Sequence, residues 1–291
     1  MNECAAIVVP MGEGVETALD TLASVEHYCT ESHLVVVVDD CTGDGTYRAL
    51  LAERKPHWRI LRNKRRLGRF RLAQSLCVGY RYVLSDTECD LVLRLDQDAL
   101  LIKPGVIIDA RIYAKANPSV GLFGVWLHDY NRPRSFECHE RLITNELSLR
   151  RKLLGLGPHW ADLLLSAEKN GYKRGDNVFG GAYFITRAAL EKVKELGALD
   201  IPYRWNSRLM EDVYFSMATV AAGFALGHFG APEGPLCLEW QGLPYPAAEL
   251  AKSNYKIVHS VDKGKNTDRA SNGGKTAREV FSDLRSADIC G

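Results

Sequence analysis

Short apolar segments alternate with amphipathic segments through the first 126 residues of the chain. Most of the apolar segments carry Val, Ile, Leu or Ala on both faces, a pattern typical of strands buried in a parallel sheet. These strands are predicted at residues 5–9, 33–38, 58–62, 90–95 and 120–126. Between them, apolar residues recur at helical spacing, which predicts helices at 14–29, 44–55, 69–84 and 103–118, with Asp44 as a helix N-cap.

This regular alternation predicts right-handed βαβ units and an α/β fold with a mainly parallel central sheet flanked by helices. Ligands of such sheets bind outside the carboxyl ends of the strands. Pro10, Asp39–Asp40 and Asp96–Asp98 each follow a predicted strand. We therefore expect an acidic edge where these strands end.

The pattern changes after residue 127. Residues 128–177 are polar and irregularly helical, which indicates a helical insertion. A strand at 178–185, helices at 186–197 and 210–223 and a late strand at 255–261 are predicted beyond it, with Thr186 as the cap of the first of these helices. A further helix is predicted at 276–285, with a capping box of Thr276 and Glu279. We expect a single domain over 1–291, divided into a half at 1–127, a half at 128–260 and a tail at 261–291.

Composition excludes several classes of protein. The chain has 291 residues, 46% hydrophobic and 25% charged, which is typical of a globular protein, and a net charge of +1 gives no general attraction to nucleic acid or membranes. No apolar run is long enough to span a bilayer, and the first residues do not resemble a secretory signal. The eight cysteines are scattered without a CxxC pair, so we expect free thiols and a cytoplasmic location.

Asp96-Gln97-Asp98 ends an otherwise buried strand. Burying carboxylates without a cationic partner is costly, and residues two apart in a strand point to the same side. Asp96 and Asp98 therefore form a candidate site for Mg²⁺ or Mn²⁺, which prefer carboxylate oxygens. The alternative is a solvated turn.

Six segments together resemble family 2-like glycosyltransferases of the GT-A fold. They are "IVVP", "VVVVDDCTGDGT", "LGRFRLAQSLCVGY", "LRLDQDALL", "GGAYFITRAAL" and "EDVYFS", in the order and approximate spacing of that family. The resemblance covers roughly residues 5–125 and 175–225. It implies a GT-A (Rossmann-like) fold, with the helical insertion belonging to the acceptor region.

The resemblance implies a site for a UDP- or GDP-linked sugar donor. It gives Asp39 and Asp40 the base and ribose, with a simple turn before Gly43 and Gly45 as the alternative. It gives Pro10 the lining of the base pocket, although "PMGEG" replaces the commoner Pro-x-Tyr-Asn. Asp96 would contact the ribose or a metal-bound water. Asp98 would bind the Mn²⁺ or Mg²⁺ that bridges the diphosphate.

Several cations could reach the diphosphate. The basic stretch 62–71 contains Arg65, Arg66 and Arg69, and arginine matches phosphate geometry, although a solvated loop is the alternative. The resemblance also implies a late histidine in the metal site, followed by a lysine that contacts phosphate. His259 followed by Lys263 fits this pattern, and His228 competes with His259.

The resemblance assigns the catalytic base to Asp212, with Glu211 orienting the acceptor. Acidic residues at a helix start are also favoured by the helix dipole, which is the structural alternative. Gly180 and Gly181 would let the backbone approach the sugar closely, and Trp205 could stack on the acceptor.

We expect a metal-dependent glycosyltransferase that inverts the anomeric centre and transfers a sugar from its donor to a sugar-containing acceptor. A retaining enzyme with the same metal site and a non-catalytic sugar-nucleotide-binding protein are the alternatives. A sugar-nucleotide pyrophosphorylase is disfavoured because the first strand lacks a GxGxR sequence. The donor sugar, acceptor and oligomeric state are not predicted.

Overall fold

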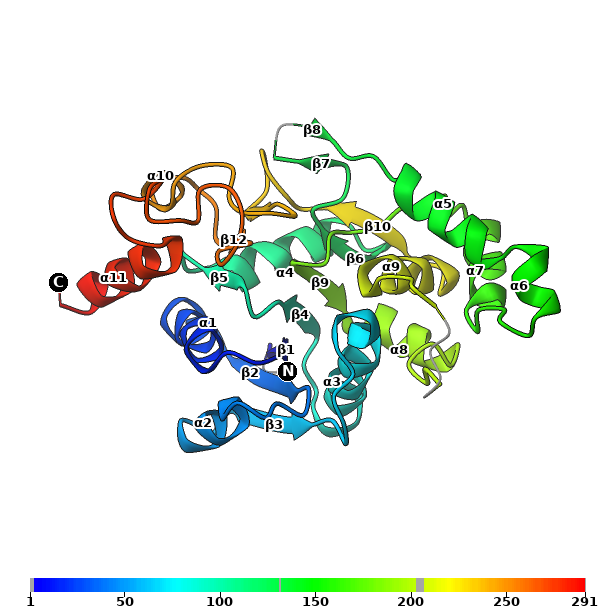
Figure 1. Cartoon of the computed structure of the whole chain (residues 1–291), viewed down its shortest axis with the longest axis horizontal. Helices are drawn as coiled ribbons and strands as arrows, with labels where there is room; N and C mark the ends of the chain where they lie inside the picture. Colours follow the sequence, from blue (N-terminus) through cyan, green and yellow to red (C-terminus); the bar gives the residue numbers. More distant parts are fainter. Residues whose placement is uncertain (1–2, 131, 203–206, 291) are drawn as a thin grey trace.

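The computed structural model of the chain describes residues 3–130, 132–202 and 207–290, without the side chains of residues 69, 152 and 288–290. Its centre is a seven-stranded sheet with the strand order β10-β6-β9-β4-β1-β2-β3 and helices on both faces (Figure 1). The strands are β1 (Ala5–Met11), β2 (His33–Asp39), β3 (Trp58–Arg62), β4 (Leu91–Leu95), β6 (Val120–Gly124), β9 (Ala182–Thr186) and β10 (Ala225–His228).

The sheet is mainly parallel, as predicted. Strands β4, β1, β2 and β3 run parallel to one another, and β10 runs parallel to β6. Among the described strands of this sheet, β9 alone is antiparallel, to both β4 and β6. The expected α/β fold with a mainly parallel central sheet flanked by helices is therefore confirmed, while the division at residues 127 and 260 stays a prediction.

Two apolar layers hold the helices against the sheet. Because side chains alternate along a strand, Ala5, Ile7 and Val9 of β1 face one layer, and Ala6 and Val8 face the other. The first layer contains side chains of α1 (Val15–Tyr28), α2 (Thr46–Ala52) and α4 (Val106–Ala116). The second contains side chains of α3 (Leu72–Asp86), α7 (Ala161–Lys169), α8 (Arg187–Glu195) and α9 (Glu211–Ala221).

A small sheet brings the late part of the chain to the end of β4. It has the order β11-β12-β5, with β5 (Ala99–Leu101), β11 (Leu236–Leu238) and β12 (Ile257–His259). Strand β5 follows the Asp96–Asp98 turn directly, and β12 pairs antiparallel with it so that His259 lies opposite Ala99. This pairing places a late histidine beside an early pair of carboxylates.

The insertion forms a helical layer at one end of the molecule, far from α1 and α2 (Figure 1). It contains the hairpin β7 (His128–Asp129) and β8 (Arg132–Pro133), then α5 (Glu137–Glu146), α6 (Leu149–Leu153) and α7. At the opposite end, α10 (Ala247–Leu250) and α11 (Ala277–Cys290) pack near α1. Within the described ranges, no helix combines the length and the apolar character needed to cross a lipid bilayer.

The helix caps agree with the sequence in two of three cases. Thr186 caps α8 by accepting a hydrogen bond from the backbone N–H of Ala189. Thr276 and Glu279 form the predicted capping box of α11, each side chain accepting from the other's backbone N–H. The prediction for Asp44 is wrong by one residue, because the N-cap of α2 is Gly45 in the left-handed region; the Asp44 carboxylate still accepts from the N–H of Thr46.

Candidate active site

Asp96, Asp98 and His259 meet at the carboxyl end of β4. Each offers one ligand atom, and the three atoms lie within 4.8 Å of one another. His259 Nε2 lies 3.1 Å from Asp98 Oδ1 and 3.9 Å from Asp96 Oδ2. The structure therefore brings together the three residues that the sequence suggested as metal ligands. We refer to Asp96, Asp98 and His259 below as the metal group.

The orientation of His259 suits a metal ligand. Its Nδ1 lies 2.9 Å from the carbonyl oxygen of Glu239, which can only accept, so Nδ1 carries the hydrogen and Nε2 faces the carboxylates. The ring packs against Phe179, with 5.6 Å between centroids. Two carboxylates and one imidazole nitrogen in this arrangement fit Mn²⁺ or Mg²⁺ with positions left for phosphate and water.

Burial and hydrogen bonding shift the pKa values of all three residues. Burial alone would raise the pKa of Asp98, but hydrogen bonds from His259 and from the Ser260 hydroxyl hold this pKa well below its ordinary value. Burial opposes the charge on His259 too, but the hydrogen bond and charge of Asp98 raise its pKa. Burial raises the pKa of Asp96 to about 7, against the lowering effect of Arg94.

Arg94 lies beneath the group and was not predicted from the sequence. Its side chain is fully buried, with Nη2 2.7 Å from Asp96 Oδ1 and 2.9 Å from Glu211 Oε1. The charge of Arg94 links a carboxylate of the metal group to one at the start of α9. The signal was present in the sequence, because Arg94 is a lone cation in an apolar strand and a buried cation requires acidic partners.

A cavity of about 750 Å³ opens beside the metal group. Predicted residues in its lining are Pro10, Asp40, Arg66, Asp96, Asp98 and Lys263. Its wall includes the loop 12–14, which Gln97 holds in place. Gln97 Oε1 accepts from the N–H of Gly12 at 2.8 Å, and its Nε2 donates to Thr17 Oγ1 at 2.8 Å and to the carbonyl oxygen of Gly14 at 3.2 Å.

The two residues of the Asp39–Asp40 pair occupy different places. Asp39 is fully buried behind the cavity, where its carboxylate accepts from Thr42 Oγ1 at 2.6 Å and lies 3.1 Å from Arg62 Nε. Asp40 lines the cavity and accepts from the backbone N–H groups of Leu67 and Gly68. Of the two, Asp40 has direct access to a molecule in the cavity.

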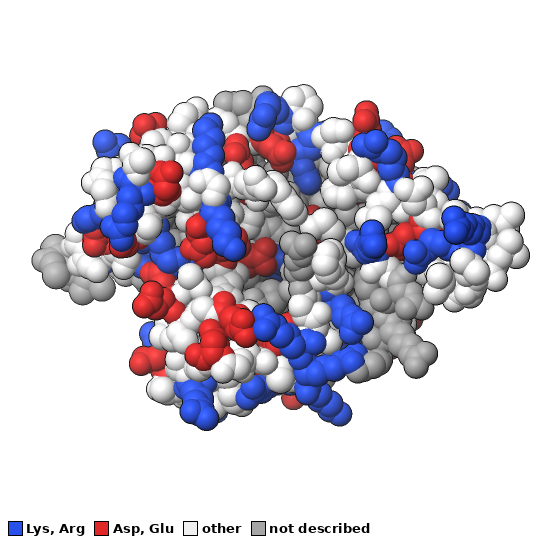
Figure 2. Space-filling view, in the orientation of Figure 1, with Lys and Arg blue, Asp and Glu red and all other residues white. Residues whose placement is uncertain are grey.

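Basic side chains gather over the segment between β3 and α3, next to acidic side chains at the hollowed middle of this face (Figure 2). Within this segment, Arg66 lines the cavity and forms a two-pronged ion pair with Glu13 at 2.8 and 3.0 Å. The side chain of Arg69 lies outside the described residues. Lys263 reaches the cavity from the other side, after β12.

A second cavity, of about 610 Å³, lies on the other side of the metal group. It shares Leu72, Asp96, Asp98 and Lys263 with the first cavity. Its own lining includes Gly180, Gly181, Glu211, Asp212, Trp240 and His259. The two cavities therefore meet at the metal group, so molecules in both would face one another across it.

Asp212 faces this second cavity from the first turn of α9. Its Oδ2 accepts from Asn177 Nδ2 at 2.7 Å, and its Oδ1 accepts from the N–H of Val213 at 2.8 Å. Burial raises the pKa of Asp212, which the charge of Arg134 lowers in turn. Burial also raises the pKa of Glu211, to about 7, against the effect of Arg94.

The paired glycines precede β9 rather than lying within it. A Cβ at Gly181 would stand 2.6 Å from Cγ of His259, and one at Gly180 would stand 2.5 Å from Oε1 of Glu211. The His259 ring therefore occupies the space beside Gly181, and the Glu211 carboxylate occupies the space beside Gly180. Trp205 lies outside the described residues, whereas Trp240, which was not predicted, lines the second cavity with 65% of its surface exposed.

His228 is engaged away from the metal group. Its Nδ1 accepts from the backbone N–H groups of Trp126 and Leu127 at 3.1 and 3.2 Å. The metal group of the described residues contains His259 instead. The structure therefore favours His259 over His228.

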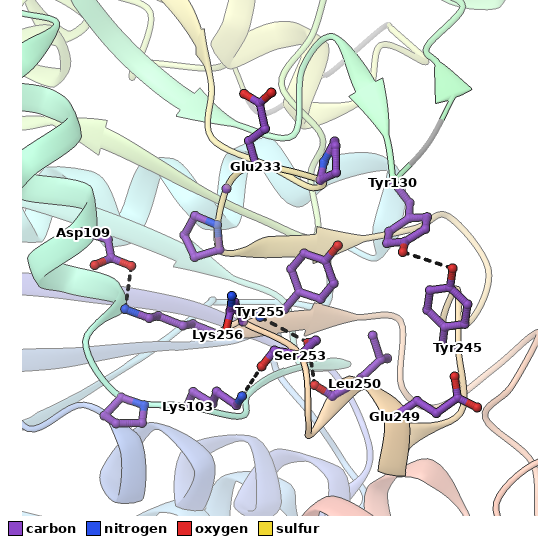
Figure 3. A pocket seen from close by; sticks show the side chains of 15 residues that line it. Lys103, Asp109, Tyr130, Glu233, Tyr245, Glu249, Leu250, Ser253, Tyr255 and Lys256 are labelled. Atoms are coloured by element: carbon purple, nitrogen blue, oxygen red, sulfur yellow. Dashed lines mark hydrogen bonds and ion pairs between the residues drawn. The ribbon is translucent and has the colours of Figure 1, made fainter.

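Another cavity, of about 760 Å³, lies apart from these carboxylates (Figure 3). Tyr130, Tyr245 and Tyr255 line it, and the hydroxyl of Tyr130 donates to that of Tyr245. Lys256 is paired there with Asp109 at 2.6 Å, and Lys103 donates to the carbonyl oxygen of Ser253. None of the predicted site residues lines this cavity, so it is not the candidate active site.

Neither a protein-family model nor a curated protein matches this chain. Among solved structures, the mannosyltransferase PcManGT from Pyrobaculum calidifontis, described in complex with GDP-Man and Mn²⁺, covers 88% of this chain at a TM-score of 0.49 and 15% identity. TarS from S. aureus covers 78% at a TM-score of 0.47 and 15% identity. The alignments span 56% and 35% of those two chains. At this similarity, the roles of individual residues depend on the geometry described above.

Proposed function

We propose that this protein is a metal-dependent glycosyltransferase of the GT-A type. It moves a sugar from a UDP- or GDP-linked donor to a hydroxyl group of a sugar-containing acceptor. One observation carries the proposal: the group of Asp96, Asp98 and His259 lies where two cavities meet, with the carboxylate of Asp212 in the second cavity.

The first cavity takes the nucleotide. Asp40 and Pro10 line its far part, where a carboxylate oxygen can accept from a base N–H or a ribose hydroxyl. Asp39 lies behind the cavity wall and holds the side chain of Thr42, which lines the cavity, by accepting its hydroxyl hydrogen. Asp96 contacts the ribose or a metal-bound water. Lys263 and Arg66, with Arg69, provide positive charge for the diphosphate.

Asp98 and His259 hold the divalent cation, Mn²⁺ or Mg²⁺, together with Asp96. When bound, this cation neutralises the negative charge that develops on the diphosphate leaving group. The residues around it fix the ligands in place: Glu239 holds the His259 ring, and Ser260 donates to Asp98.

The second cavity takes the acceptor. Asp212 accepts the proton of the acceptor hydroxyl while the oxygen of that hydroxyl forms a bond to the anomeric carbon of the donor sugar. The bond from that carbon to the diphosphate breaks, and its electron pair leaves with the diphosphate. A base on the acceptor side favours inversion. Glu211 orients the acceptor, Gly180 and Gly181 leave room for the Glu211 and His259 side chains, and Trp205 and Trp240 are candidate stacking platforms.

The test is a calorimetric titration of UDP and GDP into the protein with Mn²⁺, repeated with EDTA. Asp98→Ala is compared with Asp200→Ala, because the Asp200 side chain is 75% exposed and outside both cavities. We expect one nucleotide to bind, only with metal, in the wild type and Asp200→Ala, and at least about tenfold more weakly in Asp98→Ala. Failure of both nucleotides to bind would overturn the proposal.

A sugar-nucleotide panel then separates catalysis from simple binding. Release of free nucleoside diphosphate from one donor, lost in Asp212→Asn, supports the transferase. Binding of the donor without any release, in the presence of a panel of saccharide acceptors, would instead support a non-catalytic sugar-nucleotide-binding protein. The anomeric configuration of the product, read by NMR, distinguishes inversion from retention.

A further inference from the structure

One glutamate and two histidines gather at the edge of the sheet opposite the active site. Glu26 is on α1, His33 is the first residue of β2, and His57 comes directly before β3. Asp39 is the last residue of β2, so the strand places this cluster roughly 20 Å from it. The cluster is therefore separate from both cavities of the candidate active site.

His33 has a free ring nitrogen that is buried. Its Nδ1 lies 2.8 Å from the carbonyl oxygen of Glu31, an obligatory acceptor, so Nδ1 carries the hydrogen and Nε2 keeps a lone pair. Only 10% of the side chain is exposed, and Nε2 has no hydrogen-bond partner among the described residues. It points toward Glu26, with 4.0 Å between Nε2 and Oε1. A buried acceptor nitrogen without a partner is unfavourable, so we expect a ligand to bind it.

The other two residues complete a set of three. His57 Nε2 donates to Glu26 Oε1 at 2.8 Å, and the three possible ligand atoms all lie within 4.8 Å of one another. Tetrahedral ligands at about 2.0–2.1 Å from zinc stand about 3.3 Å apart. The two measured separations, 2.8 and 4.0 Å, lie on either side of this value. Shifts of about 0.5–0.7 Å bring both of these separations to the zinc value.

We propose that Glu26, His33 and His57 bind a divalent transition metal of the Zn²⁺ type. Imidazole nitrogens favour Zn²⁺ and similar metals over Mg²⁺, and the bond from His33 Nδ1 to a carbonyl is the usual outer support of such a ligand. For His57 to bind the metal through Nε2, its ring hydrogen must lie on Nδ1, so bonds from Nε2 and Glu26 to the metal replace the present hydrogen bond between them. Water completes the coordination.

The surroundings of Glu26 support its carboxylate in this role. Trp58 Nε1 donates to Oε1 at 2.7 Å, and Lys55 Nζ donates to Oε2 at 2.9 Å. The Lys55 side chain is 46% exposed and can turn toward solvent when the cation binds. The metal would join α1, β2 and the start of β3, so its effect is to stabilise this part of the fold.

The test uses Zn²⁺ in an Asp98→Ala/His259→Ala background, which removes the metal group of the active site. Zinc is titrated against a competing chelator, and Mg²⁺ serves as the negative control. We expect one Zn²⁺ per chain and a raised Tm. His33→Asn keeps a donor for Glu31 but removes the ligand, so zinc affinity should fall at least 100-fold, more than the roughly 10–100-fold typical of losing an outer partner.

His128→Asn is the matched control, because this exposed histidine of β7 lies outside the cluster. His57→Asn serves as a second ligand variant on a side chain that is 36% exposed, should His33→Asn fail to fold without metal. Absence of zinc binding in the background variant, or equal binding after either ligand substitution, would overturn the proposal. Neither result depends on nucleotide binding.

Discussion

Arg94 Nη2 stands 2.7 Å from Asp96 Oδ1, and the guanidinium that makes this contact is completely buried. The same nitrogen lies 2.9 Å from Glu211 Oε1. Although burial opposes the charge of Arg94, Asp96 and Glu211 raise its pKa above the ordinary value. The charge of one buried arginine thus offsets the negative charges of two carboxylates, that of Asp96 after β4 and that of Glu211 at the start of α9.

Replacing Arg94 with Met should lower the free energy of unfolding by about 3–5 kcal/mol, because it leaves the buried carboxylate of Glu211 and the partly exposed carboxylate of Asp96 without their cation. Urea denaturation followed by circular dichroism measures this loss. In Arg94→Met/Glu211→Gln, one of the uncompensated charges is gone, so part of the stability should return. A loss below about 1 kcal/mol in the single variant would contradict this account of the pair.

Gly181→Ala should weaken the metal site. The new Cβ would stand 2.6 Å from Cγ of His259, so the ring must leave its position beside Asp98. We expect Mn²⁺ affinity to fall at least about tenfold, since even residues behind a metal ligand contribute that much. Electron paramagnetic resonance of free Mn²⁺ measures the change. Gly43→Ala is the control, because no heavy atom lies within 4 Å of a Cβ there, and an equal loss in both variants would contradict the prediction.

Asp212→Asn should reduce sugar transfer by roughly 10²–10⁴-fold with donor affinity unchanged, because an amide cannot accept the acceptor proton. The base works only when ionised, and burial raises the pKa of Asp212. The wild-type rate should therefore be low at acid pH, rise as pH increases through this raised pKa, and then level off. Steady-state rates over a pH series provide the measurement. Asp200→Asn should keep the wild-type profile, and a residual pH-dependent rate of normal size in Asp212→Asn would assign the base elsewhere.

Gln97→Ala should weaken nucleotide binding without changing metal affinity. Gln97 holds the loop 12–14 through Gly12 and Gly14, but its side chain is not part of the metal group. Losing these bonds frees a wall of the first cavity, so ordering it again on binding costs affinity. Titration of the nucleotide at saturating Mn²⁺, beside a separate Mn²⁺ titration, tests both halves of the prediction. A matching drop in metal affinity would contradict it.

Periodicity predicts the first half of the fold well because most of the early strands are apolar on both faces. Ala5 and Ile7 pack on one helical layer while Ala6 and Val8 pack on the other, so the strands cannot be mistaken for surface strands. Direction is a different matter. An apolar strand has the same pattern whether it runs parallel or antiparallel, so the reversed position of β9 between β4 and β6 was not predictable from its residues.

Part of the candidate site was predictable from local sequence, and part of it depends on contacts between distant segments. Asp96 and Asp98 follow from local spacing, because residues two apart share one side of a strand. His259 reaches them only through the pairing of β12 with β5, a contact between distant segments that no local pattern contains. Asn177 and Trp240 likewise lie in irregular segments, where the sequence has no periodicity that indicates which way a side chain points.

That pairing of β12 with β5 also has a consequence in time. Ribosomes add roughly 5–20 residues per second, and 161 positions separate His259 from Asp98 (259 minus 98). The two carboxylates are therefore made roughly 10–30 seconds before the imidazole at that rate. During this interval the growing chain has only the pair of carboxylates for this one site. The three-ligand group exists only once β12 has joined β5.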